Sequence, residues 1–486
     1  MFSGFVKSNS TEREINTIKK PDNNETKGVQ TLLGNPKKAI IKLAIPMIIA
    51  MSVTTIYNLA DAAWVSGIGS DALAAVGFVF PFFFMALAIA NGLGIGAGAA
   101  ISRLIGANDK KGAGNVAAHT IVIMLIISIL FTILFYTFSN DIFSILGAGE
   151  TLDMATEYAQ IIALGTVAIF FSFIANAILR AEGDVKRAMY AMALGAGLNI
   201  ILDPIFIYTF GLGVAGAAWA TILSLSVSSL LLFYWLFFKK NTYISFHFRG
   251  FHFQKPIIKD IFKVGFPATV MQLSMSITMV VMNVIIINIG IINGVKDPHE
   301  GVAVFTVGWR IMTMATMPLI GIATAVVSVT GAAYGARDYI KLNISFMYAI
   351  KIGIIIEAII AVFIFFFAPA ITVLFTISES SALLTNDIIT FLKITCLFFP
   401  GIAFGMLSSS MFQGTGKGIN ALIVTIFRSI ILTLPLVWIF SIILEMGLPG
   451  AWWGLVTANL TGSIVAFIWA KIYIKKLKDM PSTIKQ

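Results

Sequence analysis

The chain has 486 residues, of which 58% are hydrophobic and only 12% are charged, and its formal net charge is +10. Soluble domains carry about 25% charged residues, so the composition excludes an ordinary soluble protein and predicts a surface that mostly faces lipid. The basic residues stand in short loops beside apolar runs, which favours a membrane protein over a nucleic-acid-binding protein.

The first 38 residues are polar and contain few apolar side chains. We predict that residues 1–38 form a disordered cytoplasmic tail. No apolar core with a small-residue cleavage site precedes the first long apolar run, so a signal peptide is not expected. The single cysteine, Cys396, excludes a disulfide within the chain.

Twelve apolar runs follow the tail, and each is long enough for the roughly 20 residues that a helix needs to cross a bilayer. They cover about 41–66, 73–102, 116–139, 157–179, 188–210, 214–238, 260–290, 301–332, 345–372, 386–412, 419–445 and 450–474. The chain is therefore predicted to be an all-α membrane protein with twelve transmembrane helices.

Charges in the loops separate onto two faces when the runs are counted alternately. One face receives bases such as Arg103, Lys110 and Lys239, and the other receives acids such as Asp141 and Glu150. Because Lys and Arg stay cytoplasmic, both termini are expected inside a multi-pass protein of the plasma membrane.

The two halves of the chain repeat one another. "ISRLIGANDKK" follows the second run and "TGAAYGARDYIK" follows the eighth, while Pro46 and Pro267 stand early in the first and seventh. Both halves start on the same side, which predicts two pseudo-symmetric six-helix bundles related by an axis along the membrane normal. The predicted parts are an N-terminal lobe at 39–240, a cytoplasmic linker at 241–256 and a C-terminal lobe at 257–478.

Few ionisable residues lie inside the runs, and such residues are functional candidates because burying a charge in lipid is costly. Asp61 and Asp203 both fall in the outer half of outward-going helices. Asn199 lies one turn from Asp203 on the same face, and Thr221 reaches a matching depth. Pro204 can kink its helix and free a backbone carbonyl.

The two acids and their neighbours predict a cation site. Two carboxylates in a dry pocket cannot both stay ionised alone, so either one takes a proton or a cation bridges them. Oxygen ligands suit Na⁺ as well as H⁺, which makes Asp61, Asn199, Asp203 and Thr221 a candidate Na⁺ site. A capping role for each Asp is the structural alternative, but no Lys or Arg lies at that depth in the first half.

Residues near this site are candidates for a substrate cavity. Tyr57 and Asn58 share a helix face with Asp61, and Met275 and Met279 belong to a methionine cluster in the seventh and eighth runs. Methionine either packs helices together or forms a wall that adapts to varied apolar ligands.

Glu357 and Arg310 reach similar depths in the second half. They predict either a structural ion pair or a second acidic site for a cation or substrate. Arg428 is expected to serve packing or gating.

Several of these stretches together resemble the multidrug and toxic compound extrusion (MATE) transporters, in particular their DinF-like branch, over about residues 35–478. They are "YNLADAAWVSGIGSDALAAVG", "RAEGD", "NIILDP" and "GVAGAAWAT". The resemblance implies a MATE-like fold and a coupling cation held by Asp61 and Asp203, with Asn199 and Thr221 completing the site. It adds Tyr158 and Asn176 as cavity residues.

The expected function is therefore an antiporter that uses H⁺ or Na⁺ to export lipophilic, often cationic, drugs by alternating access. We expect small-molecule substrates, contacts with membrane lipids, no nucleic acid, no cofactor and a monomer. A flippase for lipid-linked oligosaccharides or lipids is the nearest alternative, although it needs more cations in its cavity to hold phosphates. A membrane enzyme needs a nucleophile–base pair or metal ligands in the spans, and a receptor leaves the repeat unexplained.

Overall fold

The computed structural model describes residues 25–239, 241–246, 251–292, 297, 299–373 and 384–479. The N-terminal half consists of α2 (Lys27–Leu33), α3 (Pro36–Ser66), α4 (Ser70–Gly106), α5 (Lys110–Ile145), η2 (Gly149–Thr151), α6 (Leu152–Leu164), α7 (Thr166–Ala181), α8 (Val185–Pro204), η3 (Ile205–Thr209), α9 (Gly213–Phe233) and η4 (Tyr234–Phe238). The C-terminal half consists of α10 (Lys255–Ile292), α11 (Glu300–Ala315), α12 (Met317–Gly335), α13 (Tyr339–Val373), α15 (Thr385–Thr395), η5 (Cys396–Phe398), α16 (Phe399–Gly414), α17 (Gly418–Ile426), η6 (Phe427–Leu432), α18 (Thr433–Trp438), η7 (Ile439–Ile443) and α19 (Gly447–Lys478).

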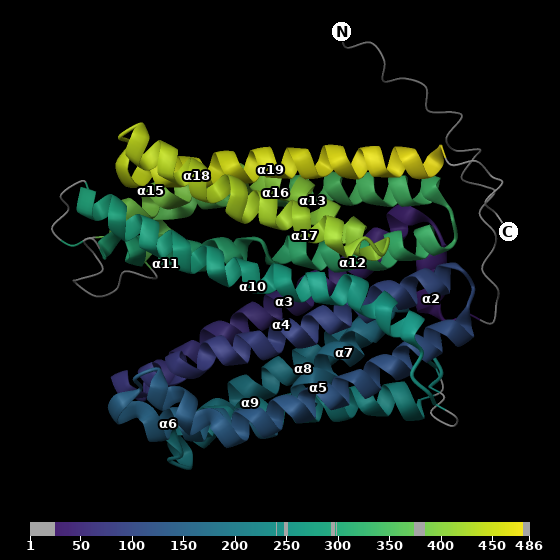
Figure 1. The fold of residues 1–486 in the computed structure, drawn as a ribbon, viewed down its shortest axis with the longest axis horizontal. Helices are drawn as coiled ribbons and strands as arrows, with labels where there is room; N and C mark the ends of the chain where they lie inside the picture. Colours follow the sequence, from purple (N-terminus) through teal and green to yellow (C-terminus); the bar gives the residue numbers. More distant parts are fainter. Residues whose placement is uncertain are drawn as a thin grey trace, which may run out of the picture.

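The predicted all-α membrane fold is confirmed. Among the described residues, eleven helices are long and apolar enough to cross a bilayer. The pair Gly149–Leu164 and Thr166–Ala181, bent by 49°, makes a twelfth span if its two parts cross together. Figure 1 shows the helices running lengthwise in two groups, α4 to α9 on one side and α11 to α19 on the other.

Matching turns reveal the repeat in three dimensions. Asn108 after α4 and Arg337 after α12 both adopt left-handed backbone conformations, with φ of 60° and 57°. Each is followed by an aspartate that caps the next helix: Asp109 accepts from the Gly112 N–H at 2.7 Å, and Asp338 accepts from the Lys341 N–H at 2.8 Å. Such caps accept hydrogen bonds from the free N–H groups at the start of a helix. The two turns therefore have the same local structure at equivalent positions of the two halves.

The structure differs from the predicted tail at residues 27–38. Thr26 caps α2, in which Val29 and Leu32 are fully buried, and α3 already begins at Pro36. The backbone of α2 passes so close to the 182–184 turn that a Cβ on Gly28 would lie 2.6 Å from the Glu182 carbonyl oxygen. Tertiary packing therefore orders a short polar segment, and residues 1–24 lie outside the described part of the chain.

The first helix of each half packs against the opposite half. The first half of α3 contacts α12, where a Cβ on Gly321 would lie 2.8 Å from the Ile48 backbone nitrogen. In the same way α10 packs on α4, where a Cβ on Gly96 would lie 2.8 Å from the Gly265 nitrogen. These glycines let backbones approach closely, so α3 and α10 link the two groups of helices.

A set of close contacts also joins the halves at the end where the basic loops lie, which we call the basic end. The Nη2 of Arg103 on α4 contacts both carboxylate oxygens of Asp260 on α10, at 2.8 and 2.9 Å, and its Nη1 donates to the Gly414 carbonyl oxygen at 3.3 Å. A Cβ on Gly106 would collide with the Ala332 backbone, and one on Gly335 would collide with the Arg103 backbone. In Figure 1 the ribbons converge at this right-hand end, near α2, and diverge toward α6 and α11.

Candidate functional site

The centre of the candidate site is the contact between α8 and α9. Asp203 and Asn199 lie one turn apart on α8, Thr221 lies on α9, and their side chains are all buried, with Asp203 at 0% exposure. Asn199 donates from Nδ2 to the Thr221 Oγ1 at 3.2 Å. Both carboxyl oxygens of Asp203 and the Oδ1 of Asn199 are buried and make no hydrogen bond with the described residues. The pocket thus holds three buried acceptor oxygens without a partner, which is the pattern a cation or proton satisfies.

Asp61 approaches this pocket from α3. Its side chain is only partly exposed, and its carboxyl group lies close enough to that of Asp203 for the two to interact directly. Tyr57, one turn earlier, lies beside Thr221, and Tyr158 of α6 lies within electrostatic range of both acids. The structure therefore brings Asp61, Asn199, Asp203 and Thr221 together, with two tyrosines beside them.

The end of α8 is irregular directly after Asp203. The α-helix ends at Pro204 and continues as a five-residue π-helix, Ile205–Thr209. Proline has no N–H to donate and clashes with the preceding turn, which disfavours regular α-helical geometry at this point. The wider turns place the buried carboxylate beside a deformable segment, a placement common at functional sites.

The remaining predicted cavity residues do not gather in one place. Asn58 is exposed on α3. Asn176 of α7 is buried and donates to the Ser172 carbonyl oxygen of its own helix at 2.8 Å, while its Oδ1 has no partner among the described residues. Met275 is 43% exposed, whereas Met279 packs against the core of the C-terminal half.

Glu357 and Arg310 do not form the expected ion pair. The ion pairs Arg103–Asp260 and Arg187–Asp184 of the described residues involve neither Glu357 nor Arg310. Glu357 is fully buried in α13 and neither carboxyl oxygen has a partner there, whereas Arg310 is exposed on α11. Sequence depth placed both side chains at one level, but the helix faces that carry them differ.

Arg428 is buried, and its side chain lies between α16 and α19. It lies on the π-helical segment η6, and its Nη1 would be 3.2 Å from a Cβ on Gly405. A Cβ on Gly462 of α19 would lie 2.8 Å from the Arg428 side chain. Two glycines therefore make room for the arginine within the helix interface.

The chemistry of the site suits a hard monovalent cation or a proton. The described residues hold no group of three or more His, Cys, Asp or Glu side chains placed to bind a metal. Two carboxylates, an amide and a hydroxyl instead offer only oxygen ligands, the donor type that hard cations prefer.

A further buried carboxyl group, Glu182, carries no predicted role. Its side chain is 1% exposed in the turn between α7 and α8, and its Oε2 accepts from the N–H groups of Tyr243 at 3.0 Å and Ile244 at 3.2 Å. Burial raises its pKa to about 8, against the lowering effect of these hydrogen bonds and of Arg187. The sequence signal for this residue was its place in the "RAEGD" motif, which holds two acids in a loop on the basic face.

This raised pKa predicts that the stability of the protein falls as pH rises. The folded carboxyl group binds its proton more tightly than the unfolded one, so its contribution is full below about pH 4.5 and is lost as pH rises through about 8. We expect the melting temperature to fall by several degrees between pH 6 and pH 9. In Glu182→Gln, which imitates the protonated side chain, that fall should be smaller; tryptophan fluorescence melts at both pH values measure it. An equal fall in both proteins would contradict the assignment.

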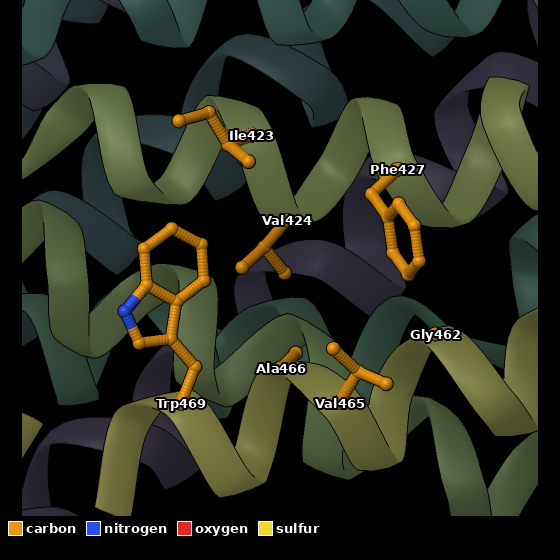
Figure 2. Close-up of a pocket in the computed structure, with 7 residues that line it drawn as sticks. All are labelled: Ile423, Val424, Phe427, Gly462, Val465, Ala466 and Trp469. Atoms are coloured by element: carbon orange, nitrogen blue, oxygen red, sulfur yellow. The ribbon is translucent and has the colours of Figure 1, made fainter. Parts of the chain in front are cut away.

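An apolar pocket of about 190 Å³ lies elsewhere, between α17, η6 and α19. Figure 2 shows its lining, in which Ile423, Val424 and Phe427 face Val465, Ala466 and Trp469 across the two helices. Ile423 and Val465 are 48% and 42% exposed, so the pocket belongs to the outer surface of the C-terminal half. Its lining has no charged side chain, which separates it from the acidic site.

Comparison with known proteins gives one family. The MatE family matches residues 46–205 and 267–439. The multidrug export protein MepA of Staphylococcus aureus (strain MRSA252) is 27% identical over 439 residues, which cover 89% of this chain and 92% of that protein.

Two solved structures are each 48% identical to the chain, with a TM-score of 0.90, and cover 94% of it and 100% of their own length. One is described as the outward-facing conformation of a multidrug resistance MATE family transporter of the MOP superfamily. The other is a MOP superfamily transporter from Pyrococcus furiosus, in which reverse polarity of the binding pocket suggests a different function.

Proposed function

The chain belongs to the MatE family, as its motifs indicated, and we propose that it is a cation-coupled antiporter that exports lipophilic, often cationic, compounds. The export of drugs is supported by the name of the MepA relative, a multidrug export protein. Coupling to H⁺ or Na⁺ is our inference from the acids of the N-terminal half.

One observation carries the coupling: Asp203 is fully buried beside Asp61, and neither of its oxygens has a hydrogen-bond partner among the described residues. A buried unpaired carboxylate is strongly disfavoured, so the pocket has to take up a positive charge. Asn199 and Thr221 hold one another at 3.2 Å and leave the Asn199 Oδ1 for the same cation. No base stands in place of that cation, because the described ion pairs lie elsewhere.

The geometry of α3 suggests how the charge is transmitted. Asp61 lies in the part of α3 that meets α8, while the first turns of the same helix pack on α12. Cation binding changes the net charge of the acidic pair. We infer that it therefore also changes how α3 packs against the other helices of the N-terminal half. Because the other end of α3 contacts the opposite half, that change can bias the arrangement of the two halves.

Exchange follows if the cation and a cationic substrate compete for the same negative charge. Tyr57, Tyr158 and Asn58 lie on the helices that carry or surround the acids, and we propose that they line the substrate path. We extend this proposal to Met275 and Met279 of α10 and to Asn176 of α7. Aromatic and methionine side chains suit varied lipophilic cations.

The flippase alternative needs cations in the substrate path to hold phosphate groups. Arg428 is packed between helices, and Arg310 is exposed on α11. With two carboxylates at the candidate site and Arg428 enclosed, the charge distribution supports a cationic substrate better than a lipid-linked phosphate.

We expect each chain to work as a monomer, since one chain supplies all four residues of the cation site. We also propose that the protein lies in the plasma membrane with both termini in the cytoplasm, because the basic loops share a face with both termini. Impermeant labelling of a cysteine added at either terminus, in intact and opened cells, tests the orientation. Labelling of the added cysteine in intact cells would show that this terminus lies outside, which is the opposite of the proposed orientation.

Proteoliposomes test the coupling directly. A pH gradient and a Na⁺ gradient are imposed separately while the uptake or release of a fluorescent lipophilic cation is followed. We expect one of the two gradients to drive the dye in the opposite direction to the ion, and at one-to-one exchange a tenfold ion gradient sustains at most about a tenfold dye gradient. If the rate of dye movement depends on neither gradient, the proposal of cation coupling is wrong. Transport of a lipid-linked sugar in place of the dye would favour the flippase alternative.

A further inference from the structure

A second, basic groove lies at the basic end of the C-terminal half. It has a volume of about 340 Å³ and lies between the start of α13 and the end of α19. Its lining residues are Asn343, Lys471, Ile472, Ile474, Lys475 and Lys478.

Three lysines share one face of α19 in this groove. Lys471, Lys475 and Lys478 stand at spacings of four and three residues, which places them above one another on a helix. Lys471 donates from Nζ to the Asn343 Oδ1 at 3.0 Å, so its ammonium group is held toward α13. Lys478 lies near enough for the two ammonium groups to repel each other.

The positive charge of the groove is not neutralised by the protein among the described residues. Lys475 and Lys478 are exposed, and neither belongs to one of the two described ion pairs. The nearest acids in sequence are Asp479, which is exposed after the helix, and Asp338, whose Oδ1 caps α13 by accepting from the Lys341 N–H. An anion that bridges the lysines would relieve their mutual repulsion.

The groove continues into the apolar surface of the same helix. Ile472 belongs to its lining and is 49% exposed, and Ile468 and Ile464, on the lysine-bearing side of α19, are 50% and 51% exposed. Exposed isoleucines on a membrane-spanning helix face acyl chains. Basic and apolar surfaces thus meet where headgroups meet acyl chains, which favours a phospholipid over a free phosphate ion.

We propose that this groove binds the phosphate of an anionic phospholipid from the leaflet at the basic end. The phosphate lies among Lys471, Lys475 and Lys478, and an acyl chain follows Ile472 and Ile468. Basic grooves between transmembrane helices on the cytoplasmic side are a known type of lipid headgroup site. The lipid would join the ends of α13 and α19 through Asn343 and the lysines. The site is independent of the acidic pair and of the transported compound.

The test uses the full chain in a neutral detergent and compares Lys475→Gln/Lys478→Gln and the triple variant that adds Lys471→Gln with the native protein. Dioleoylphosphatidylglycerol, dioleoylphosphatidylcholine and glycerol phosphate are added as separate probes, and retained lipid is counted by native mass spectrometry with melting temperature measured in parallel. The matched control is Lys38→Gln/Lys42→Gln/Lys186→Gln, which removes three exposed lysines that do not line the groove.

We expect phosphatidylglycerol to be retained and to raise the melting temperature of the native and control proteins. Each lysine near a headgroup contributes about 1 kcal/mol. The apparent affinity for phosphatidylglycerol should therefore weaken about thirtyfold in the double variant and further in the triple variant. Phosphatidylcholine should have little effect on any of them. Equal phosphatidylglycerol binding by the groove and control variants would overturn the proposal, as would an effect of glycerol phosphate as large as that of the lipid. The double variant changes only exposed side chains, so it should fold if the triple variant does not.

Discussion

Asp203→Asn should abolish export of a lipophilic cation while leaving the protein folded in the membrane. The asparagine has nearly the shape of the acid but cannot carry the negative charge that attracts the cation. Both Asp203 oxygens lack partners among the described residues and the side chain is fully buried, so the substitution removes the negative charge without breaking a described hydrogen bond. In proteoliposomes the initial rate of ion-driven dye exchange should fall at least about tenfold, the effect of about 1.4 kcal/mol.

The control is Asp153→Asn, which neutralises an exposed acid in the first turn of α6 and should leave exchange unchanged. Asp61→Asn should resemble Asp203→Asn, because the two carboxyl groups interact directly. If Asp61→Asn and Asp203→Asn both exchange dye at the native rate, the acidic pair is not the coupling site, whatever the control does.

Gly106→Ala should weaken the closure of the basic end and slow export at least about fivefold. The added Cβ would collide with the Ala332 backbone, which cannot escape by changing a rotamer. Overpacking of this kind costs about 1–3 kcal/mol, and a cost of that size shifts a two-state equilibrium about 5- to 150-fold. Spin labels on Lys186→Cys and Ile340→Cys, in a Cys396→Ser background, should report a longer distance between the halves. The symmetry-related Gly335→Ala should shift the distance in the same direction.

Gly77→Ala is the matched control for this change. It lies on α4 as well, but nothing lies within 4 Å of its added Cβ. It should therefore gain slightly in helix stability and keep the native label distance. An unchanged distance in Gly106→Ala, or the same change in both variants, would show that the close crossing of α4 and α12 does not hold the basic end together.

The spans and the acidic site followed from local patterns. Hydropathy located the spans, because the bilayer requires long apolar runs whatever their packing. The approach of Asn199 to Thr221 was expected from helical spacing and depth, and the structure places these two side chains 3.2 Å apart. Depth along a helix is readable from sequence because the rise per residue is fixed.

Helix rotation and tertiary contacts were not readable in this way. Glu357 and Arg310 share a depth but not a facing direction, so the expected ion pair was wrong. Residues 27–33 became a helix because Val29 and Leu32 find partners in the folded bundle, which local polarity does not reveal. The burial of Glu182 likewise depends on backbone N–H groups some sixty residues further along the chain.

The cross-packing of α3 separates two kinds of failure that an exchanger can suffer. Its 31 residues span about 46 Å at 1.5 Å per residue; Asp61 lies near the end of the helix, and Ile48, which contacts Gly321, lies about 20 Å from it near the middle. We expect a lesion at the acidic end to deprive the protein of the cation that we propose it binds. We expect a lesion at Ile48 or Gly321 to leave cation binding intact but to uncouple it from the arrangement of the two halves. Such a variant would let its substrate move down the substrate's own concentration gradient without ion exchange.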